Sequence, residues 1–326
     1  MYKKLIISIL IVISSISFIS CNDITKNNSE EHKEIISIEE NSNSDDNKRI
    51  IDKMEVINEL ASDKYEGRLV GSKGNELVEE YLNNMFNNLD LKPVFKDSFK
   101  HEYSQEVSET YGLISDDNEV KVKNVNNIIG KIEGEKADNS IVISAHFDHI
   151  GKLDGKIVNG AIDNASGISV LLDLIEELNL KFSNSKPEFD IIFCAFNGEE
   201  KGLEGSRNFV VDIKGRYKNM ININIDSVGY INGGDITFLN KNDNKINNLM
   251  KQSLEKNNLN VSESSKLKGM SDSKSFESDG IENVCIVEEN VKEVIHSLED
   301  TVDKVNYESL DNIVKSIINF IDNYKF

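Results

Sequence analysis

The chain is poor in cysteine and has a deficit of positive charge. Three cysteines in 326 residues do not imply a disulfide framework, and Cys194 and Cys285 lie inside apolar runs typical of buried, inert thiols. The 57 acidic residues outnumber the 37 basic ones and give a formal net charge of −20. Such a surface repels phosphate backbones, so a nucleic-acid partner is not expected. Histidine is also scarce, with five in the chain.

The N-terminus has the pattern of a bacterial lipoprotein signal peptide. A basic start is followed by an apolar stretch over residues 5–19, and Phe18-Ile19-Ser20-Cys21 resembles a lipobox. We expect an exported protein held at the membrane by lipid on Cys21, with residues 22–47 as a flexible polar tether. The alternative is an uncleaved N-terminal anchor, although the run is short for a spanning helix. Both interpretations place the rest of the chain outside the cytoplasm.

From residue 48 to 326, apolar strands alternate with helical patterns. Buried strands are predicted at residues 141–145, 189–196, 220–225, 236–239 and 284–287. Helices are predicted at residues 76–89, 167–180, 203–213, 245–256 and 309–324. This alternation predicts one α/β domain, a three-layer sandwich with a mixed, mostly parallel central sheet. Shorter strand-like pieces over residues 95–125 are expected to form an antiparallel edge.

Residue types that bind divalent metals follow several of these strands. His146 closes the first strand, Glu199-Glu200 follow the next, and Asp226 follows the third. In open α/β sheets, ligands bind beyond the C-terminal ends of the strands. Histidines and carboxylates brought together there make a site for Zn²⁺ or a similar ion.

Each candidate also has a purely structural interpretation. Asp163 suits a helix N-cap, Glu199-Glu200 suit the first turn of a helix, Asp226 suits a turn, and His296 suits a surface position. These interpretations would have to hold for every candidate at the same edge of the sheet. The combined pattern therefore favours a metal site.

Five ordered motifs contain the candidate residues. The motifs are Ser144-Ala145-His146-Phe147-Asp148-His149, the run from Gly160 to Gly167, the run from Phe196 to Ser206, Asn224-Ile225-Asp226-Ser227-Val228-Gly229, and the run from Ile295 to Thr301. Together they resemble the di-zinc aminopeptidase family, which includes secreted bacterial leucyl aminopeptidases and is related to glutamate carboxypeptidase II. An N-terminal segment around Glu66-Gly67-Arg68 is also similar, so the resemblance covers residue 62 to the C-terminus.

The resemblance implies two zinc ions bound by five side chains. His146 and Asp226 would hold one ion, Glu200 and His296 the other, and the Asp163 carboxylate would bridge them. Paired ions of this kind lie about 3.5–4 Å apart and share a water. Mn²⁺ and Co²⁺ also bind such histidine and carboxylate sets.

The resemblance further implies roles for two residues that do not bind metal. Glu199 would be the general base, taking a proton from the shared water and delivering it to the leaving amine. Asp148 would accept a hydrogen bond from the His146 ring and fix its orientation. In the family the peptide bond after the bridging aspartate is cis, which implies a cis bond between Asp163 and Asn164.

The sequence departs from the family at positions outside the implied ligand set. Ser273 stands where many relatives have a histidine, and residues 266–268 lack the tyrosine that supports the oxyanion in some relatives. Ser297 replaces the usual threonine after His296. His149 is an additional histidine, interpreted as a loop residue near the ligands but outside them.

These patterns predict an extracytoplasmic metallo-aminopeptidase that acts on peptide substrates. Two alternatives stay open. A glutaminyl cyclase would use a related fold and a similar acid-rich site to cyclise N-terminal Gln. A catalytically inactive binding protein could use the same scaffold, although such proteins usually lose ligands or the base.

Overall fold

The computed structural model describes residues 49–108, 110, 120–239, 244–262 and 267–326. The predicted signal peptide and tether, including Cys21, lie outside these residues. Within the described ranges, the structure contains no helix that is both long and apolar enough to cross a bilayer.

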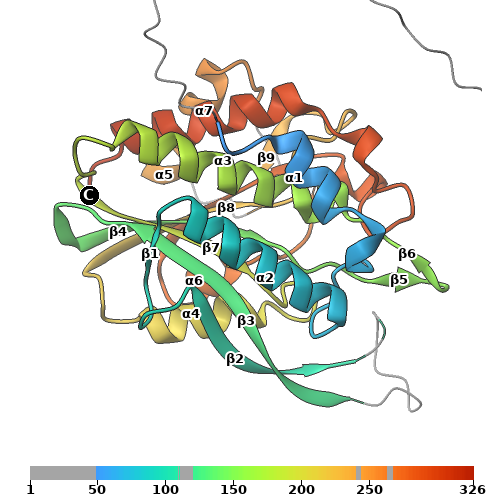
Figure 1. Ribbon diagram of the computed structural model, residues 1–326. Helices are drawn as coiled ribbons and strands as arrows, with labels where there is room; N and C mark the ends of the chain where they lie inside the picture. Colours follow the sequence, from blue (N-terminus) through green and yellow to red (C-terminus); the bar gives the residue numbers. More distant parts are fainter. Residues whose placement is uncertain (1–48, 109, 111–119, 240–243, 263–266) are drawn as a thin grey trace, which may run out of the picture. The chain divides into compact units, whose positions relative to one another are not determined.

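A mixed sheet of eight strands forms the centre of the fold (Figure 1). Strands β7, β4, β8 and β10 are parallel to their neighbours in this series, whereas the strands at both edges pair antiparallel. The predicted mixed, mostly parallel sheet is therefore confirmed. In spatial order the strands are β1 (Lys92–Pro93), β3 (Lys121–Ile132), β7 (Phe189–Phe196), β4 (Lys136–His146), β8 (Asn219–Ile225), β10 (Glu282–Glu288) and β9 (Ile236–Phe238), with β2 (Lys100–Val107) paired to β3.

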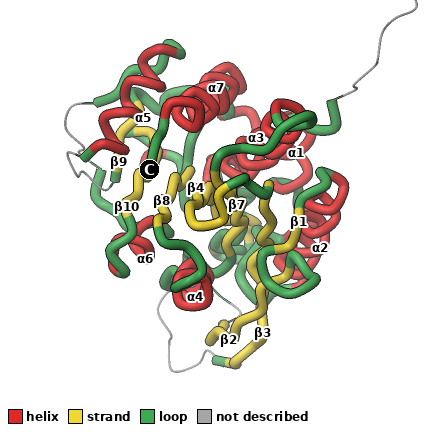
Figure 2. Tube along the Cα trace, turned by 90° about the vertical axis from the view of Figure 1, so that its left-hand side faces the viewer, coloured by secondary structure: helices red, strands yellow, loops and turns green. Residues whose placement is uncertain are grey.

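Helices cover both faces of the sheet, which gives the predicted three layers (Figures 1 and 2). Short elements complete the described chain: the hairpin of β5 (Lys152–Leu153) and β6 (Lys156–Ile157), the turn Ala161–Ala165, and single turns at Asp63–Tyr65, Val291–Glu293 and Val302–Lys304. One face carries α1 (Lys53–Leu60), α2 (Lys73–Asn88), α3 (Ser166–Lys181), α5 (Lys245–Lys256) and α7 (Tyr307–Asn323), and the other carries α4 (Glu204–Ile213) and α6 (Ser273–Ser278).

The period-two pattern of the central strands sets these layers. In β4, Ile141 and Ile143 pack into the core beneath α3, whereas Val142 between them packs toward α4 and α6. Strand β7 is buried along its whole length because both of its faces are covered. Strands that are buried on both faces have continuous apolar sequences, and for this reason they can be located from the sequence.

The predicted elements match the observed ones closely in the centre of the fold and less well at its edge. Helix α5 has the predicted bounds, and Asn244 caps it by accepting a hydrogen bond from the backbone N–H of Asn247. The expected antiparallel edge is present as β2 and β3, but β3 continues to Ile132, beyond the predicted segment. Helices α1 and α6 were not predicted.

Candidate metal centre

Three adjacent parallel strands bring candidate ligands to one edge of the sheet. His146 is the last residue of β4, Asp226 directly follows β8, and Glu200 lies four residues beyond the end of β7. His146 pairs with Phe196 in the β4–β7 ladder, so the strand ends are level. This arrangement is the one expected from the sequence.

The donor atoms form two groups that share Asp163. Asp163 Oδ1 lies 3.3 Å from His146 Nε2, which in turn lies 3.4 Å from Asp226 Oδ1. Asp163 Oδ2 lies 3.1 Å from His296 Nε2, which lies 2.9 Å from Glu200 Oε1. Each oxygen of one carboxylate therefore faces a different group, as a bridging ligand requires.

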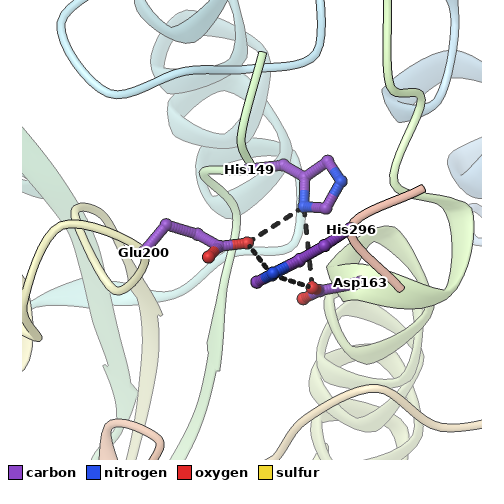
Figure 3. A group of neighbouring side chains, drawn as sticks. All are labelled: His149, Asp163, Glu200 and His296. Atoms are coloured by element: carbon purple, nitrogen blue, oxygen red, sulfur yellow. Dashed lines mark hydrogen bonds and ion pairs between the residues drawn. The ribbon is translucent and has the colours of Figure 1, made fainter. Parts of the chain in front are cut away.

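His149 lies in the second of these groups (Figure 3). Its Nδ1 is 3.1 Å from Glu200 Oε1 and 3.6 Å from Asp163 Oδ2, and its side chain is fully buried. The candidate ligand set of the second group is thus His149, Asp163, Glu200 and His296, and that of the first is His146, Asp163 and Asp226. The loop after β4 turns the His149 ring toward the other candidate donors, so His149 lies closer to them than the sequence indicated.

The carboxylates of the centre are buried and crowded, and the histidines compensate them. Burial lowers the pKa of His296, but hydrogen bonds to Asp163 and Glu200 outweigh it and raise that pKa to about 10. For Asp163, burial acts to raise the pKa, and contacts with His146 and His296 more than reverse this and hold it well below its usual range. Buried carboxylates that stay ionised can bind a cation directly, so this site suits a metal ion.

Asp163 is held in place by its own turn. The peptide bond between Asp163 and Asn164 is cis, which confirms that expectation. Asp300 accepts hydrogen bonds from the backbone N–H groups of Ile162 and Asp163 at 2.6 and 3.1 Å. The interpretation of Asp163 as an N-cap is excluded, because Asn164 Oδ1 accepts from Gly167 N and the Asp163 carboxylate faces the histidines.

Asn164 also connects this turn to the end of β8. Its Nδ2 donates to the carbonyl of Ile225 at 3.0 Å, and its Oδ1 accepts from the backbone N–H of Ser227 at 3.1 Å. These two residues flank Asp226, so one amide side chain positions the bridging aspartate relative to the aspartate of the first group.

Asp148 is buried beside the centre, but its contacts differ from the prediction. His146 Nδ1 lies 3.1 Å from the backbone carbonyl of Asp148 and 3.8 Å from its carboxylate, so the carbonyl is the acceptor of the ring N–H. The carboxylate instead accepts the backbone N–H groups of Glu199 and Glu200 at 3.1 and 3.2 Å. Burial raises the pKa of Asp148 to about 7. Asp148 therefore fixes the backbone that carries the two glutamates.

Glu199 lines the same cavity but belongs to neither ligand set. Burial raises the pKa of its carboxyl well above the usual range, and the negative charges of Glu200 and Asp226 add to that effect. A carboxylate with a raised pKa next to a metal-binding group can accept and return a proton near neutral pH.

Arg68 joins the loops around the centre, a function that the sequence did not reveal. It is 1% exposed and donates to five backbone carbonyls at 2.6–3.2 Å. The acceptors are the carbonyls of Leu60, Phe147, Asn159, Gly160 and Asp163. Because these acceptors lie on segments far apart in the chain, only the similarity of Glu66-Gly67-Arg68 to the family could have drawn attention to this residue.

A cavity of about 550 Å³ opens beside both ligand sets. Its polar wall is formed by His146, Asp163, Glu199, Glu200, Asp226 and His296. The rest of the described lining is largely apolar and includes Leu239, Leu267, Met270, Val287, Val291 and Ile295. Ser273 is buried at the start of α6 and is not part of the cavity lining, and Lys266 lies outside the described residues.

Comparison with protein families identifies the group to which these residues belong. The model of peptidase family M28 matches residues 127–321, a range that contains every candidate ligand and Glu199. The chain belongs to peptidase family M28. The resemblance to zinc aminopeptidases is thereby confirmed at the level of the family.

Curated relatives match parts of the chain. A probable zinc metalloprotease of Pyrenophora tritici-repentis is 34% identical over 111 residues, covering 32% of this chain and 25% of that protein. The alkaline phosphatase isozyme conversion protein of Escherichia coli is 28% identical over 177 residues, covering 50% and 47%. A glutamate carboxypeptidase 2 homolog of Caenorhabditis elegans is 32% identical over 115 residues, covering 34% and 14%. The matches span less than half the length of these relatives.

Solved structures share the fold over most of this M28 chain. A zinc aminopeptidase from Bacillus subtilis superposes with a TM-score of 0.66 at 15% identity, covering 84% of this chain and 96% of that one. A glutaminyl cyclase from Fimbriiglobus ruber superposes with a TM-score of 0.65 at 16% identity, covering 84% and 94%. The fold is therefore that of zinc exopeptidases, and the fold alone does not separate hydrolysis from cyclisation.

Proposed function

We propose that this M28 chain is a di-zinc aminopeptidase that removes N-terminal residues from peptides. The observation that carries the proposal is the division of the Asp163 carboxylate, whose two oxygens face two separate ligand sets. A shared carboxylate is what a pair of adjacent metal ions requires, and such pairs activate one water between them.

The donor atoms suit zinc. Imidazole nitrogen and carboxylate oxygen are typical zinc ligands, and both sets combine them within 4.8 Å. His146, Asp163 and Asp226 would hold one ion, and the set containing Glu200 and His296 would hold the other. Bound zinc would lower the pKa of the shared water and polarise the scissile carbonyl. Mn²⁺ and Co²⁺ also suit this donor set.

Glu199 is assigned the proton transfers. Its carboxylate lies in the cavity wall, outside both ligand sets, so it is free to take a proton from water and return it to the leaving amine. Asp148 supports this role by accepting the backbone N–H of Glu199, which limits the movement of the residue. The carboxylate of the adjacent Glu200, in contrast, contacts the rings of His149 and His296 through Oε1.

The cavity suits a peptide end with an apolar side chain. The largely apolar part of the lining offers contacts for an aliphatic or aromatic side chain. Among the described residues that line the cavity, Lys292 is the one lysine or arginine. We therefore expect substrates with an apolar N-terminal residue to be preferred over acidic ones.

Zinc content combined with peptide hydrolysis tests the proposal. The purified full chain is assayed for bound zinc and for release of amine from a panel of aminoacyl-anilides, with and without chelator. We expect about two zinc ions per chain and chelator-sensitive hydrolysis of apolar substrates. Absence of bound metal would contradict the proposal directly.

A glutaminyl cyclase is the second candidate, because such an enzyme superposes as well as an aminopeptidase does. Incubation of the metal-loaded protein with an N-terminal glutaminyl peptide separates the two. Release of free Gln supports the aminopeptidase, and formation of pyroglutamate with loss of ammonia supports the cyclase. Bound metal with neither product would favour an inactive binding protein.

We also propose that the protein is exported and anchored by lipid on Cys21. The support is the basic start, the apolar stretch and the lipobox-like Phe18-Ile19-Ser20-Cys21. Metabolic labelling with a fatty acid is expected to label the full chain and to leave the Cys21→Ser variant unlabelled. Equal labelling of both proteins would contradict lipidation at this position.

A further inference from the structure

His149 is the residue of the second ligand set that the two-metal assignment does not use. Figure 3 shows its ring directed at the same point as Asp163, Glu200 and His296. Within the described residues, the polar contacts of the ring run through Nδ1, while Nε2 is buried without a hydrogen-bond partner. The polar contacts that orient the ring are therefore those of Nδ1 with Glu200 and Asp163.

The surrounding backbone fixes this orientation. His149 N donates to the carbonyl of Arg68 at 3.3 Å, and Gly151 N donates to the carbonyl of Gly67 at 2.9 Å. Gly160 adopts a φ of +62°, and a Cβ at that position would stand 2.6 Å from His149 Cδ2. The imidazole thus packs against bare backbone, and a side chain at residue 160 would displace it.

Four of the six separations between the donor atoms are equal to or somewhat shorter than those of a tetrahedral zinc site. Zinc–nitrogen and zinc–oxygen bonds of about 2.0–2.2 Å place tetrahedral ligand atoms about 3.3–3.6 Å apart. The four known separations in this set are 2.9, 3.1, 3.1 and 3.6 Å, two of which involve His149 Nδ1. All four atoms lie within 4.8 Å of one another. His149 therefore stands where a fourth ligand would stand.

We propose that His149 is a protein ligand of the second metal position through Nδ1, which makes the two positions unequal. The second position has four protein donors, and the first has three, His146, Asp163 and Asp226. A zinc position with three protein donors has more room for water or substrate than one with four. The shared water would then be a fourth ligand at the first position and a fifth at the second, which makes the first position the more open one for substrate.

This ligand assignment deepens the proposed two-metal function and rests on it. The competing role is that of a positioning residue, in which the Nδ1–H of His149 donates to Glu200 and orients it. The two roles differ in whether the His149 ring is bonded to the metal. Loss of activity would not distinguish the two roles, so the test must measure directly whether the His149 ring is bonded to the metal.

Proton NMR of the cobalt-loaded full chain supplies that measurement. An imidazole bonded to Co²⁺ has its remaining N–H strongly shifted through the bonds, whereas a ring held only by a hydrogen bond does not. The Nε2–H of a ligating His149 is buried and should exchange slowly. We expect one exchangeable shifted resonance to disappear in His149→Asn while the others remain. His101→Asn, a change at a buried histidine outside the centre, should retain all of them.

Chelator competition on the same variants provides a second readout. The amide of His149→Asn can still donate to Glu200, whereas His149→Ala cannot. Loss of a ligand predicts that both variants release the second ion at least about tenfold more readily. Full affinity in His149→Asn together with an unchanged set of shifted resonances would overturn the assignment and leave the proposed function intact. Fewer than two bound ions in the unmodified protein would overturn both.

Discussion

The candidate ligands fall into two groups that differ in how the fold positions them. His146, Glu200 and Asp226 lie at or after strand ends and form the strand-borne side, whereas Asp163 and His296 lie on turns and loops and form the loop-borne side. His146 is the last residue of β4, and Asp226 and Glu200 follow the adjacent strands β8 and β7, so the hydrogen-bonded ladder brings these segments to one edge of the sheet. Asp163 and His296 lie on loops between elements, and His296 has a left-handed φ of +55°. The turn that carries Asp163 is held by the buried side chains of Arg68, Asn164 and Asp300. A rigid sheet thus supplies one half of the site, and a hydrogen-bond network supplies the other.

The largest expected difference between the two sides is in the number of metal ions lost when the aspartate of each side is replaced. Asp163 serves both ligand sets, whereas Asp226 serves one. Asp163→Asn is therefore expected to lose both ions and all measurable turnover, and Asp226→Asn to retain about one ion per chain. Metal analysis after dialysis checks this, with Asp303→Asn, at an exposed carboxylate, as the control. Equal metal loss in the two variants would mean that Asp163 does not bridge.

Glu199 follows a strand but should affect chemistry rather than metal binding. Glu199→Gln retains the size of the side chain and removes its capacity to accept a proton. We expect kcat to fall by about 10²–10⁴-fold with metal content unchanged, since general-base catalysis contributes on this scale. The half-buried Glu204→Gln, at a carboxylate on α4 outside both ligand sets, is a matched control. An unchanged rate in Glu199→Gln would exclude the general-base assignment.

The strand-borne half could be predicted from the sequence, and most of the loop support could not. Buried parallel strands are continuous apolar runs, so their ends, and the residues that follow, can be located from composition alone. Arg68 and Asp300 act on backbone groups of distant segments, and backbone partners leave no trace in a sequence. Asp163 and His296 were candidates because of their residue types, and only the motif resemblance assigned them to a pair of metal ions.

The same reason explains the errors at the periphery. Helix α6 spans six residues with one large buried apolar side chain, Phe276, which is too little for a helical period. Strand β3 begins with exposed polar residues at the edge of the sheet, and its buried part comes later. The position of His149 was missed because a loop, rather than a strand, determines where its ring points.

Arg68 tests whether the loop-borne half depends on its hydrogen-bond network. Arg68→Lys keeps the positive charge but leaves several of the five carbonyl acceptors unsatisfied in a buried site. The expected loss in the free energy of unfolding is about 3–5 kcal/mol, measured by urea denaturation. The exposed Arg207→Lys should change it by no more than about 0.5 kcal/mol. Similar values for both variants would show that the network is dispensable.

The smallest effect concerns Glu288, a buried carboxylate at the end of β10 away from both ligand sets. It accepts the backbone N–H groups of Gly229 and Tyr230, and burial raises its pKa from 4.5 to about 7. The unfolded chain releases this proton at lower pH than the folded protein. Stability from this group is therefore complete below pH 4.5 and is lost as the pH rises through 7, by about 3 kcal/mol.

Glu288→Gln removes that titration while keeping one acceptor oxygen for the two N–H groups. We expect the variant to be less stable than the unmodified protein near pH 5 by about 1 kcal/mol or more, and the difference to shrink or reverse near pH 8. Unfolding by urea across this pH range measures the difference directly, with the exposed Glu282→Gln on the same strand as the control. A constant difference at all pH values would mean that Glu288 stays ionised throughout, and the backbone groups around Asp226 would then be held by a charge.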